Sequence, residues 1–371
     1  MASTASAWQN VPLPERLEWG ERHMKKTAEA ARRLPSMVGT RLATCVHIDV
    51  KTAVYLHAFR AAGAEVAVMP ADVRTTRADV AEYMAHEMDI FGVAADAHAH
   101  AGADCVAWGP THTLEMGGDI TAAAVASDYR GIIAGIEVTR TGINRLGGVD
   151  LTHPVFDLDR VPLKNNIHNR YAVGLSTWHA FMSRTNLSLH GRVVVVVGFG
   201  EVGSGLASAA RSLGARVIIV EQDPIRCVIA TYEGYETAPL PSAAARADVL
   251  VTATGHSGVV SARIMEMLPD GAFLLNAGHS ATEVDLESLG TGTAVLPHVT
   301  SHRPYGNEIL LVAGGHIVNL VAGDGDTLNS FDITAALMVS SVGWMVLQDT
   351  NHAPGIHTLP SEAWQASVLE A

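Results

Sequence analysis

Five consecutive valines followed at once by spaced glycines constrain the fold of this chain more than any other feature. Val193–Val197 has no polar face, so a strand there must be buried on both sides, as in a parallel sheet covered by helices. Gly198, Gly200 and Gly203 follow, then a helix to about Leu213 and the strand Arg216–Val220. This strand, turn, helix and strand predict an α/β fold of the Rossmann type.

The same glycines indicate a dinucleotide site. Gly198 permits a tight turn, Gly200 lets the backbone approach a pyrophosphate, and Gly203 lets the helix pack on the strand. The helix N-terminus offers unpaired N–H groups to the phosphates. Glu221 lies 23 residues after Gly198, where a carboxylate accepts hydrogen bonds from the adenosine ribose and repels a 2′-phosphate. NAD is therefore the predicted cofactor. A degenerate fold without cofactor is the alternative, which the intact glycines disfavour.

A second strand–helix–strand pattern precedes this unit. Arg41–His47, Val50–Ala62 and Glu65–Met69 predict another parallel sheet. Residues 131–136 and 149–163 look like loops, and Asp96–Trp108 has no clear assignment. Helices are expected at Glu15–Arg33, Tyr171–Arg184 and Ser330–Leu347, and further strands at Asp248–Thr252, Ala272–Asn276 and Glu308–Val312.

At 371 residues the chain is too long for one ordinary core. We predict an α/β substrate-binding domain with a parallel sheet at 1–184 and a Rossmann NAD-binding domain at 185–324. Residues 325–371 form a C-terminal helical segment that returns to the first domain.

Composition narrows the classes of partner. The net charge is −13 with no basic stripe, which disfavours nucleic acid. The N-terminus has no apolar signal region and no run of about 18 apolar residues stands out, so neither membrane nor export is expected and the chain is predicted to be cytoplasmic. The three cysteines lack metal spacing, and no metal is predicted.

Lysine is scarce in this chain. Of 25 basic residues only four are lysines: Lys25, Lys26, Lys51 and Lys164. Coding bias towards arginine explains the scarcity, but a lysine that persists is a candidate for a role that needs an amine able to lose its proton. Lys25 and Lys26 fit a solvated helix, which leaves Lys51 and Lys164.

Several motifs resemble the adenosylhomocysteinases along most of the chain. The stretch from Gly198 to Gly205, together with Asn276-Ala-Gly-His279 and Val318-Asn-Leu320, resembles that family's cofactor domain. Cys45-Val-His-Ile-Asp-Val-Lys-Thr-Ala-Val54 is similar to its CLHMTVETAV segment, Gly117-Gly-Asp119 to its GGD turn, and Thr139-Arg-Thr-Gly142 to its TTTG loop.

The resemblance implies a specific chemistry. NAD oxidises a ribose 3′-hydroxyl, a base removes the acidified C4′ proton, the C5′ substituent leaves, and the ketone is finally reduced. It implies catalytic roles for Lys164 (the base for the 3′-hydroxyl), His47 (beside C5′), His279 (water and proton steps), His168 and Asn169. The implied cofactor contacts are Gly198, Gly200, Glu201, Val202, Gly203, Glu221, Thr139, Arg140, Thr141, Asn169, Thr252, Thr254, Gly255, Asn276, Gly278, His279 and Asn319.

The substrate positions depart from the family pattern. Met116 stands where the family has an aspartate, next to Glu115, and Val138 replaces a glutamate next to Glu137. His168 replaces an aspartate, and Asp49 and Lys51 replace a threonine and a glutamate near the base. The predicted substrate contacts are His47, Asp49, Lys51, Thr52, Glu115, Met116, Glu137, Lys164, His168, Asp324, Asn329 and Phe331.

These departures predict a new nucleoside substrate. We expect a nucleoside dehydratase that stops after elimination and leaves a 4′,5′-unsaturated nucleoside. The alternatives are a hydrolase of S-adenosyl- or S-inosylhomocysteine and, from another class, a non-catalytic NAD-binding regulatory paralogue. The sequence stops near Ala371, without the family's tail of roughly forty residues, in which a Lys and a Tyr reach a neighbouring subunit's NAD site. NAD is therefore expected to be held within one chain of a homo-oligomer, a dimer or tetramer with the dimer slightly favoured.

Overall fold

The computed structural model describes residues 6–278, 281–348 and 352–365, and the chain forms two compact units. The Rossmann unit comprises Met1–Asn10 and Asn166–Thr327, and the flanking unit comprises Val11–Asn165 and Leu328–Ala371. The sequence pattern predicts the first boundary at 184. The units divide earlier, at Asn166, because helix α9 (Val173–Thr185) packs against α10 (Glu201–Ser212) and α15 (Val318–Val321) inside the Rossmann unit.

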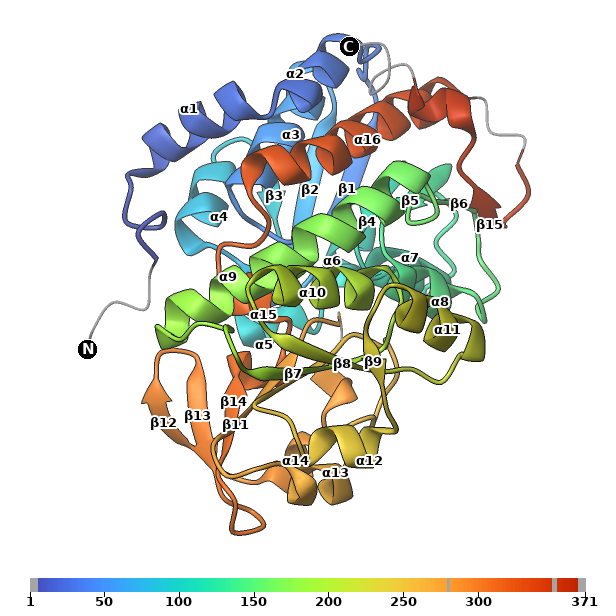
Figure 1. Cartoon of the computed structure of the whole chain (residues 1–371). Helices are drawn as coiled ribbons and strands as arrows, with labels where there is room; N and C mark the ends of the chain where they lie inside the picture. Colours follow the sequence, from blue (N-terminus) through green and yellow to red (C-terminus); the bar gives the residue numbers. More distant parts are fainter. Residues whose placement is uncertain (1–5, 279–280, 349–351, 366–371) are drawn as a thin grey trace. The chain divides into compact units, whose positions relative to one another are not determined.

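The Rossmann unit is built on an eight-stranded sheet in the order β12-β13-β14-β11-β10-β7-β8-β9 (Figure 1). β7 pairs in parallel with β8 and β10, β10 with β11, and β11 with β14, whereas β12 and β13 are antiparallel additions. The strands are β7 (Val193–Val197), β8 (Arg216–Val220), β9 (Glu236–Thr237), β10 (Val249–Thr252), β11 (Ala272–Asn276), β12 (Thr293–Leu296), β13 (Val299–His302) and β14 (Ile309–Val312).

Strand β7 is buried on both faces, as its five valines require. Val194 and Val196 join the core beneath α9, α10 and α15, and Val195 and Val197 join the core on the opposite face. This confirms the predicted Rossmann fold class. The remaining helices of the unit are α11 (Pro224–Tyr232), α12 (Leu240–Ala244), α13 (Ala262–Met267), α14 (Leu286–Leu289), and the 3₁₀ turns Ala281–Glu283 and Ala313–Gly315.

The flanking unit contains a seven-stranded, all-parallel sheet in the order β15-β6-β5-β4-β1-β2-β3 (Figure 1). Its strands are β1 (Arg41–Val46), β2 (Glu65–Pro70), β3 (Asp89–Ile90), β4 (His112–Glu115), β5 (Ala134–Glu137), β6 (Pro154–Asp157) and β15 (Gly355–Thr358). Its helices are α1 (Leu13–His23), α2 (Lys25–Arg32), α3 (Val50–Ala61), α4 (Ala78–Met84), α5 (Ala95–His98), α6 (Ala101–Ala107), α7 (Asp119–Ala126), α8 (Arg140–Leu146) and α16 (Leu328–Leu347), with 3₁₀ turns Val73–Thr75 and Ser361–Ala363.

Three local expectations differ from the structure. The loops expected at 131–136 and 149–163 were wrong, because these stretches contain β5 and β6, four-residue strands that begin Ala-Gly and Pro-Val and are too short to show a period. The helix expected at Glu15–Arg33 is two helices broken at Met24, whose backbone is not helical. The unassigned stretch Asp96–Trp108 holds most of α5 and α6.

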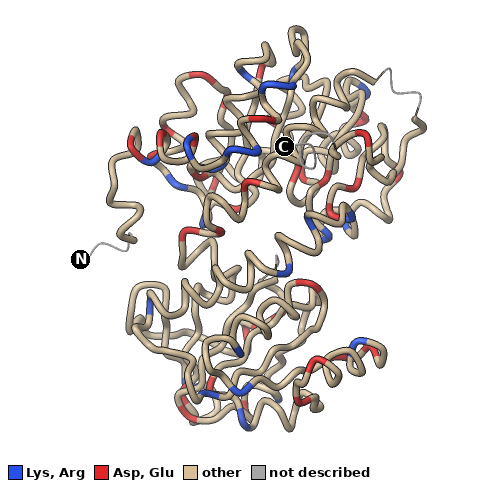
Figure 2. The backbone as a smooth tube through the Cα atoms, turned by 45° about the horizontal axis from the view of Figure 1, so that its top comes forward, with Lys and Arg blue, Asp and Glu red and all other residues tan. Residues whose placement is uncertain are grey.

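Helix α16 has the length and apolar composition of a membrane span, with a mean hydropathy of 1.5 over its best window. Two thirds of that window (67%) is buried inside the protein, where α16 packs on α2 and α3. Its apolar character therefore follows from its place in the core of the flanking unit. Along the backbone of each unit, acidic and basic residues are interspersed (Figure 2).

Candidate functional site

The glycine turn after β7 has the shape that the sequence predicts. Gly198 has a φ of +98°, and a Cβ there would lie 2.7 Å from the carbonyl oxygen of Ala253. A Cβ on Gly203 would lie 1.9 Å from the carbonyl oxygen of Gly198, so α10 can approach the turn only with glycine there. A Cβ on Gly200 would meet only Arg226 Nη1, at 3.7 Å, which leaves this side of the turn open for a phosphate.

Glu221 lies directly after β8 beside this turn. Its carboxylate accepts hydrogen bonds from the backbone N–H groups of Phe199 at 2.7 Å, Gln222 at 2.6 Å and Asp223 at 3.0 Å. Burial alone would raise the pKa of Glu221, but these amides and Arg226 lower it overall. The side chain is therefore an anion placed to accept from ribose hydroxyls. Glu201 and Val202, in the first turn of α10, lie in the same region, and Glu201 faces Arg170 at 3.8 Å.

The turn after β10 depends on a residue that no sequence motif marks. Glu283 is fully buried and accepts from the N–H groups of Thr254 and Gly255, both at 2.9 Å, and from Thr254 Oγ1 at 2.7 Å. A Cβ on Gly278 would lie 1.9 Å from Glu283 Oε1, which explains that glycine. No spacing signal identifies Glu283, because it acts on a turn nearly thirty residues earlier in the chain.

Asn276 and Thr252 tie the strand ends together. Asn276 Oδ1 accepts from Thr252 Oγ1 at 3.1 Å and from the Gly278 N–H at 2.7 Å, while its Nδ2 donates to the Gly315 carbonyl at 3.0 Å. Both side chains are fully buried. In this structure they shape the turn, and direct contact with NAD stays a prediction.

A buried polar chain lies elsewhere in the Rossmann unit. Asn319 Nδ2 donates to Ser176 Oγ at 3.1 Å, Ser176 Oγ donates to Asp326 at 2.6 Å, and Asp326 lies 2.6 Å from His168 Nε2. Among the described residues, Oδ1 of Asn319 is a buried acceptor without a hydrogen-bond partner. An unsatisfied buried acceptor costs free energy, so this atom fits a donor such as the nicotinamide carboxamide.

The remaining predicted site residues of the Rossmann unit lie in separate segments of the chain. Asn169 is half-buried in the π-helix Lys164–Ala172, the element in which the chain passes from the flanking unit to the Rossmann unit. Asp324 accepts hydrogen bonds from Ser6 Oγ at 2.8 Å and Gln9 Nε2 at 2.7 Å, so its carboxylate binds the N-terminal segment of the chain. His279 lies outside the described residues.

In the flanking unit, carboxylates line up at the carboxyl ends of three adjacent strands. Glu115, Glu137 and Asp157 are register partners across β4, β5 and β6. Glu115 accepts from the N–H groups of Ile120 and Thr121 at the start of α7, at 2.7 and 3.1 Å. Glu137 accepts from the Gly117 N–H at 3.1 Å and the Thr139 N–H at 2.8 Å, at the start of α8.

Burial dominates the electrostatics of this row. It raises the pKa of Glu115 to about 7 and, with the charge of Glu115, the pKa of Glu137 to about 8. Glu137 is completely buried, and Met116, which follows Glu115 in the chain, belongs to the hydrophobic core. Both carboxylates therefore accept hydrogen bonds from backbone N–H groups at helix N-termini, and their contact with substrate stays a prediction.

A second charged group lies around the start of α3. Asp49 caps this helix by accepting from the Thr52 N–H at 3.1 Å, and its other oxygen lies 2.5 Å from Lys51 Nζ. Lys51 is buried, with Nζ 6.0 Å from the centre of the Phe331 ring. The predicted base-contacting residues are thus brought together, whereas Asn329 is exposed at the start of α16.

His47 follows β1 and is oriented by Thr75. Its Nδ1 lies 2.8 Å from Thr75 Oγ1, whose own proton goes to the Asp72 carbonyl at 2.8 Å. Thr75 must therefore accept, so His47 carries its proton on Nδ1. Proton exchange between His47 and a substrate stays a prediction.

Lys164 lies in the flanking unit at the start of the π-helix. The residue is 6% exposed, and its Nζ lies 3.3 Å from Asp159 Oδ1. Arg140, at the start of α8, reaches the other oxygen of Asp159 at 2.7 Å. Asp159 was not singled out from the sequence, because it lies in a stretch that looked like a loop. Thr139 caps α8, with Thr141 in the first turn.

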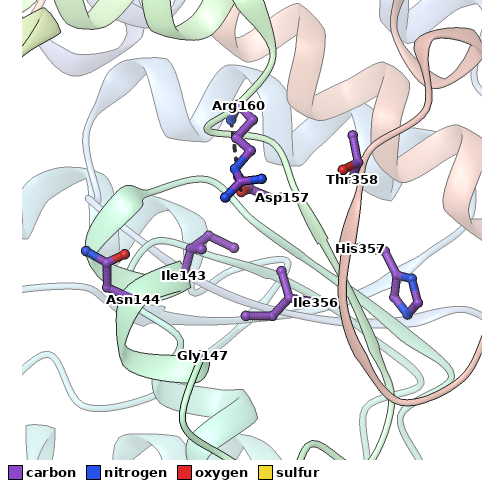
Figure 3. A pocket seen from close by; sticks show the side chains of 8 residues that line it. All are labelled: Ile143, Asn144, Gly147, Asp157, Arg160, Ile356, His357 and Thr358. Carbon is purple, nitrogen blue, oxygen red and sulfur yellow. Dashed lines mark hydrogen bonds and ion pairs between the residues drawn. The ribbon is translucent and has the colours of Figure 1, made fainter.

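A cavity opens beside this region of the flanking unit, between α8, the end of β6 and β15 (Figure 3). Its lining residues are Ile143, Asn144, Gly147, Asp157, Arg160, Ile356, His357 and Thr358. Across the part of the chain that the structure describes, no group of three His, Cys, Asp or Glu side chains is arranged to hold a metal ion.

Comparisons with known proteins agree with this geometry. The model of the NAD-binding domain of S-adenosyl-L-homocysteine hydrolase matches residues 169–325. Adenosylhomocysteinase from Pyrobaculum aerophilum is 33% identical over 362 residues, covering 87% of this chain and 83% of that protein. S-inosyl-L-homocysteine hydrolase from Methanopyrus kandleri is 31% identical over 385 residues, covering 93% and 86%.

Among solved structures, a dipicolinate synthase component from Bacillus halodurans is similar with a TM-score of 0.53 at 15% identity, covering 83% of this chain and 99% of that one. This likeness supports the α/β fold alone. The comparisons and the glycine turn together give the Rossmann unit its cofactor, which is NAD.

Proposed function

Because this chain belongs to the adenosylhomocysteinase family, whose members are NAD-dependent hydrolases, we propose that it oxidises a nucleoside 3′-hydroxyl and then eliminates the C5′ substituent. The observation that carries the proposal is Lys164. A buried lysine, unlike an arginine, can lose its proton and then act as a base, and the Asp159 carboxylate holds its Nζ in place. Arginine elsewhere supplies most of the positive charge of this chain.

Two residues of this chain, Lys164 and His47, carry the proton transfers of the proposed reaction. When bound, NAD supplies oxidation of the hydroxyl to a ketone and the later reduction of that ketone. Lys164 Nζ takes the hydroxyl proton in the first step. The ketone acidifies the C4′ hydrogen, and loss of that proton expels the C5′ group. His47, with its Nδ1 proton donated to Thr75, takes the C4′ proton at Nε2 and passes that proton to the leaving group.

We propose that the leaving group is hydroxide and the product a 4′,5′-unsaturated nucleoside, so that the net reaction is loss of one water. Support comes from the altered side chains around the substrate. Asp49 and Lys51 form an ion pair at the two positions where the family motif has a threonine and a glutamate. Met116, which stands where the family has an aspartate, is part of the hydrophobic core. A changed set of contacts with an intact Lys164 favours a new substrate over lost activity.

The hydrolase reading is the second candidate. Identities of 31–33% to an S-inosyl-L-homocysteine hydrolase and an adenosylhomocysteinase favour a thioether substrate, with water added back after elimination. A regulatory paralogue that binds NAD without turnover is the third, and the retained Lys164–Asp159 pair argues against it.

Mass spectrometry of the reaction products distinguishes the three candidate functions. The purified protein is incubated with adenosine, other adenine nucleosides and S-adenosylhomocysteine in parallel. A product lighter than its nucleoside by one water supports the dehydratase. Release of homocysteine supports the hydrolase, and no product in any sample, with NAD bound, supports the regulatory paralogue.

We further propose that the chain forms a homo-oligomer. Helix α11 exposes one apolar face, formed by Ile225, Val228, Ile229 and Tyr232, of which Ile225 is 69% and Tyr232 88% exposed. Exposed apolar stripes of this kind occur at protein interfaces. Mass photometry of the wild type and of Tyr232→Ser tests this, and an unchanged monomer in both samples would contradict it.

A further inference from the structure

We propose that Asp159 is the positioning residue for Lys164, and that Arg140 holds Asp159 in this role. The proposal rests on the proposed oxidation of a nucleoside hydroxyl. Asp159 is 2% exposed and places one carboxylate oxygen on each partner, Oδ1 at 3.3 Å from Lys164 Nζ and Oδ2 at 2.7 Å from Arg140 Nη2. The family resemblance does not mark either Asp159 or its contact with Arg140.

The neighbouring carboxylate has a different partner. Asp157, two residues earlier and equally buried, places Oδ2 at 3.1 Å from Arg160 Nε (Figure 3). The same oxygen lies 3.9 Å from Arg140 Nη1. Its Oδ1 accepts the Arg160 N–H at 3.1 Å. Asp157 is therefore joined to the turn after β6, and Asp159 to Lys164. The two aspartates form a natural pair of test and control.

The arrangement explains how a flexible amine keeps one position. A lysine side chain loses several rotamers when it is fixed, and one contact fixes it only if the partner is itself immobile. Arg140 supplies that immobility by binding the second oxygen of Asp159.

The chemical consequence concerns the first step of the proposed reaction. The O–H bond of the substrate breaks as an N–H bond forms at Lys164 Nζ, and the hydride leaves C3′ for NAD. The amine becomes an ammonium beside the Asp159 carboxylate. Asp159 contributes by keeping Nζ in one position for this transfer, while its own two oxygens are bound to Lys164 and Arg140.

The test compares Asp159→Asn with Asp157→Asn in the NAD-loaded protein. Bound NAD reduction is followed at 340 nm after mixing with excess adenosine at several concentrations. We expect Asp159→Asn to lower the limiting rate at least about tenfold, with the half-saturating adenosine concentration and the bound NAD unchanged. Asp157→Asn should stay within about twofold of the wild type. A loss shared by both variants, or a change confined to the half-saturating concentration, contradicts the proposal.

A second measurement does not depend on turnover. The same three proteins are treated briefly with an amine-acetylating reagent, and acetylation of Lys164 is quantified by peptide mapping against Lys25 and Lys26. A Lys164 side chain that the carboxylate no longer holds in its buried position should be more accessible and react at least about tenfold faster in Asp159→Asn, with no change in Asp157→Asn. Equal reactivity in all three overturns the positioning role. If the wild type shows no NAD reduction, the proposed function fails, and acetylation alone decides the role of Asp159.

Discussion

The two units place different chemical groups at the edge of the sheet where their parallel strands end. In both, parallel strands end at one edge of a sheet. In the Rossmann unit the shape of that edge is set by backbone turns, with Gly198 at a turn that only glycine fits and the N–H groups of Thr254 and Gly255 bound to the buried Glu283 carboxylate. In the flanking unit it consists of charged side chains, such as Glu115 and Glu137.

This difference predicts that the Rossmann unit tolerates fewer substitutions at its cofactor site than the flanking unit tolerates at its side-chain site. A backbone site tolerates little substitution, because a Cβ at Gly203 would lie 1.9 Å from a carbonyl oxygen. A side-chain site can be re-formed with new charges, and the ion pair of Asp49 with Lys51 is the kind of contact that such a change would produce. We therefore expect cofactor binding to resemble that of relatives and substrate choice to differ.

The largest effect should come from the amine of the flanking unit. Lys164→Arg keeps a positive charge but removes a group that can act as a base near neutral pH. We expect reduction of bound NAD by substrate to fall by about 10²–10⁴-fold, with the fold and the NAD content retained. Lys25→Arg, on exposed α2, is the control. Wild-type rates in Lys164→Arg would remove Lys164 from the mechanism.

The next effect should come from the one carboxylate of the Rossmann edge that faces the glycine turn. Glu221→Ala removes a ribose acceptor and frees three backbone N–H groups. NAD binding should weaken by about 1–3 kcal/mol, measured by calorimetry on protein stripped of cofactor. The matched control is Glu236→Ala, a surface residue paired with Arg246. An unchanged affinity would show that the ribose contact lies elsewhere.

A smaller effect concerns stability against pH in the flanking unit. The pKa values of Glu115 and Glu137, about 7 and about 8, lie above the usual 4.5, so the folded state binds protons that the unfolded state releases. Stability is greatest below about pH 4.5 as far as these groups are concerned, and it falls as the pH rises towards about 8. Urea unfolding across that range should show this slope, and Glu137→Gln should flatten it. A slope that is unaltered in Glu137→Gln would contradict the assignment.

The smallest expected effect is none at all. If each chain holds its NAD by its own residues, dilution that dissociates the oligomer should leave the bound NAD unchanged. Cofactor fluorescence and mass photometry across one dilution series measure both quantities. Loss of NAD in step with dissociation would mean that a partner chain completes the site.

Sequence alone predicted the two units unequally, for a physical reason. The strands Val193–Val197 and Arg216–Val220 were predicted to the residue, because long apolar runs and glycine spacing are local signals. The strands β5 and β6 were missed, because four residues give no period, and the missed strands end in Glu137 and Asp157. The chemically distinctive part of the flanking unit was therefore the least visible.

Side-chain partners were the other limit of sequence reasoning. Lys164 was singled out by lysine scarcity and motif, but its partner Asp159 could not be, since the pairing depends on how the chain turns after β6. Glu283 was not predicted for the same reason, because its hydrogen bond with Thr254 joins residues that are far apart in the sequence. Residues recognised by family motif alone, such as Asn276, turned out to have structural contacts that a motif does not reveal.

Strand β15 has a consequence for solubility. By pairing with β6, it covers backbone groups that would otherwise form an open sheet edge, and Phe156 of β6 contacts the rings of His352 and His357. The strand that then becomes outermost is only four residues long, and β3 at the opposite edge has two. Short outer strands offer little template for pairing with another chain, so both edges of this fully parallel sheet are poor sites for edge-to-edge aggregation.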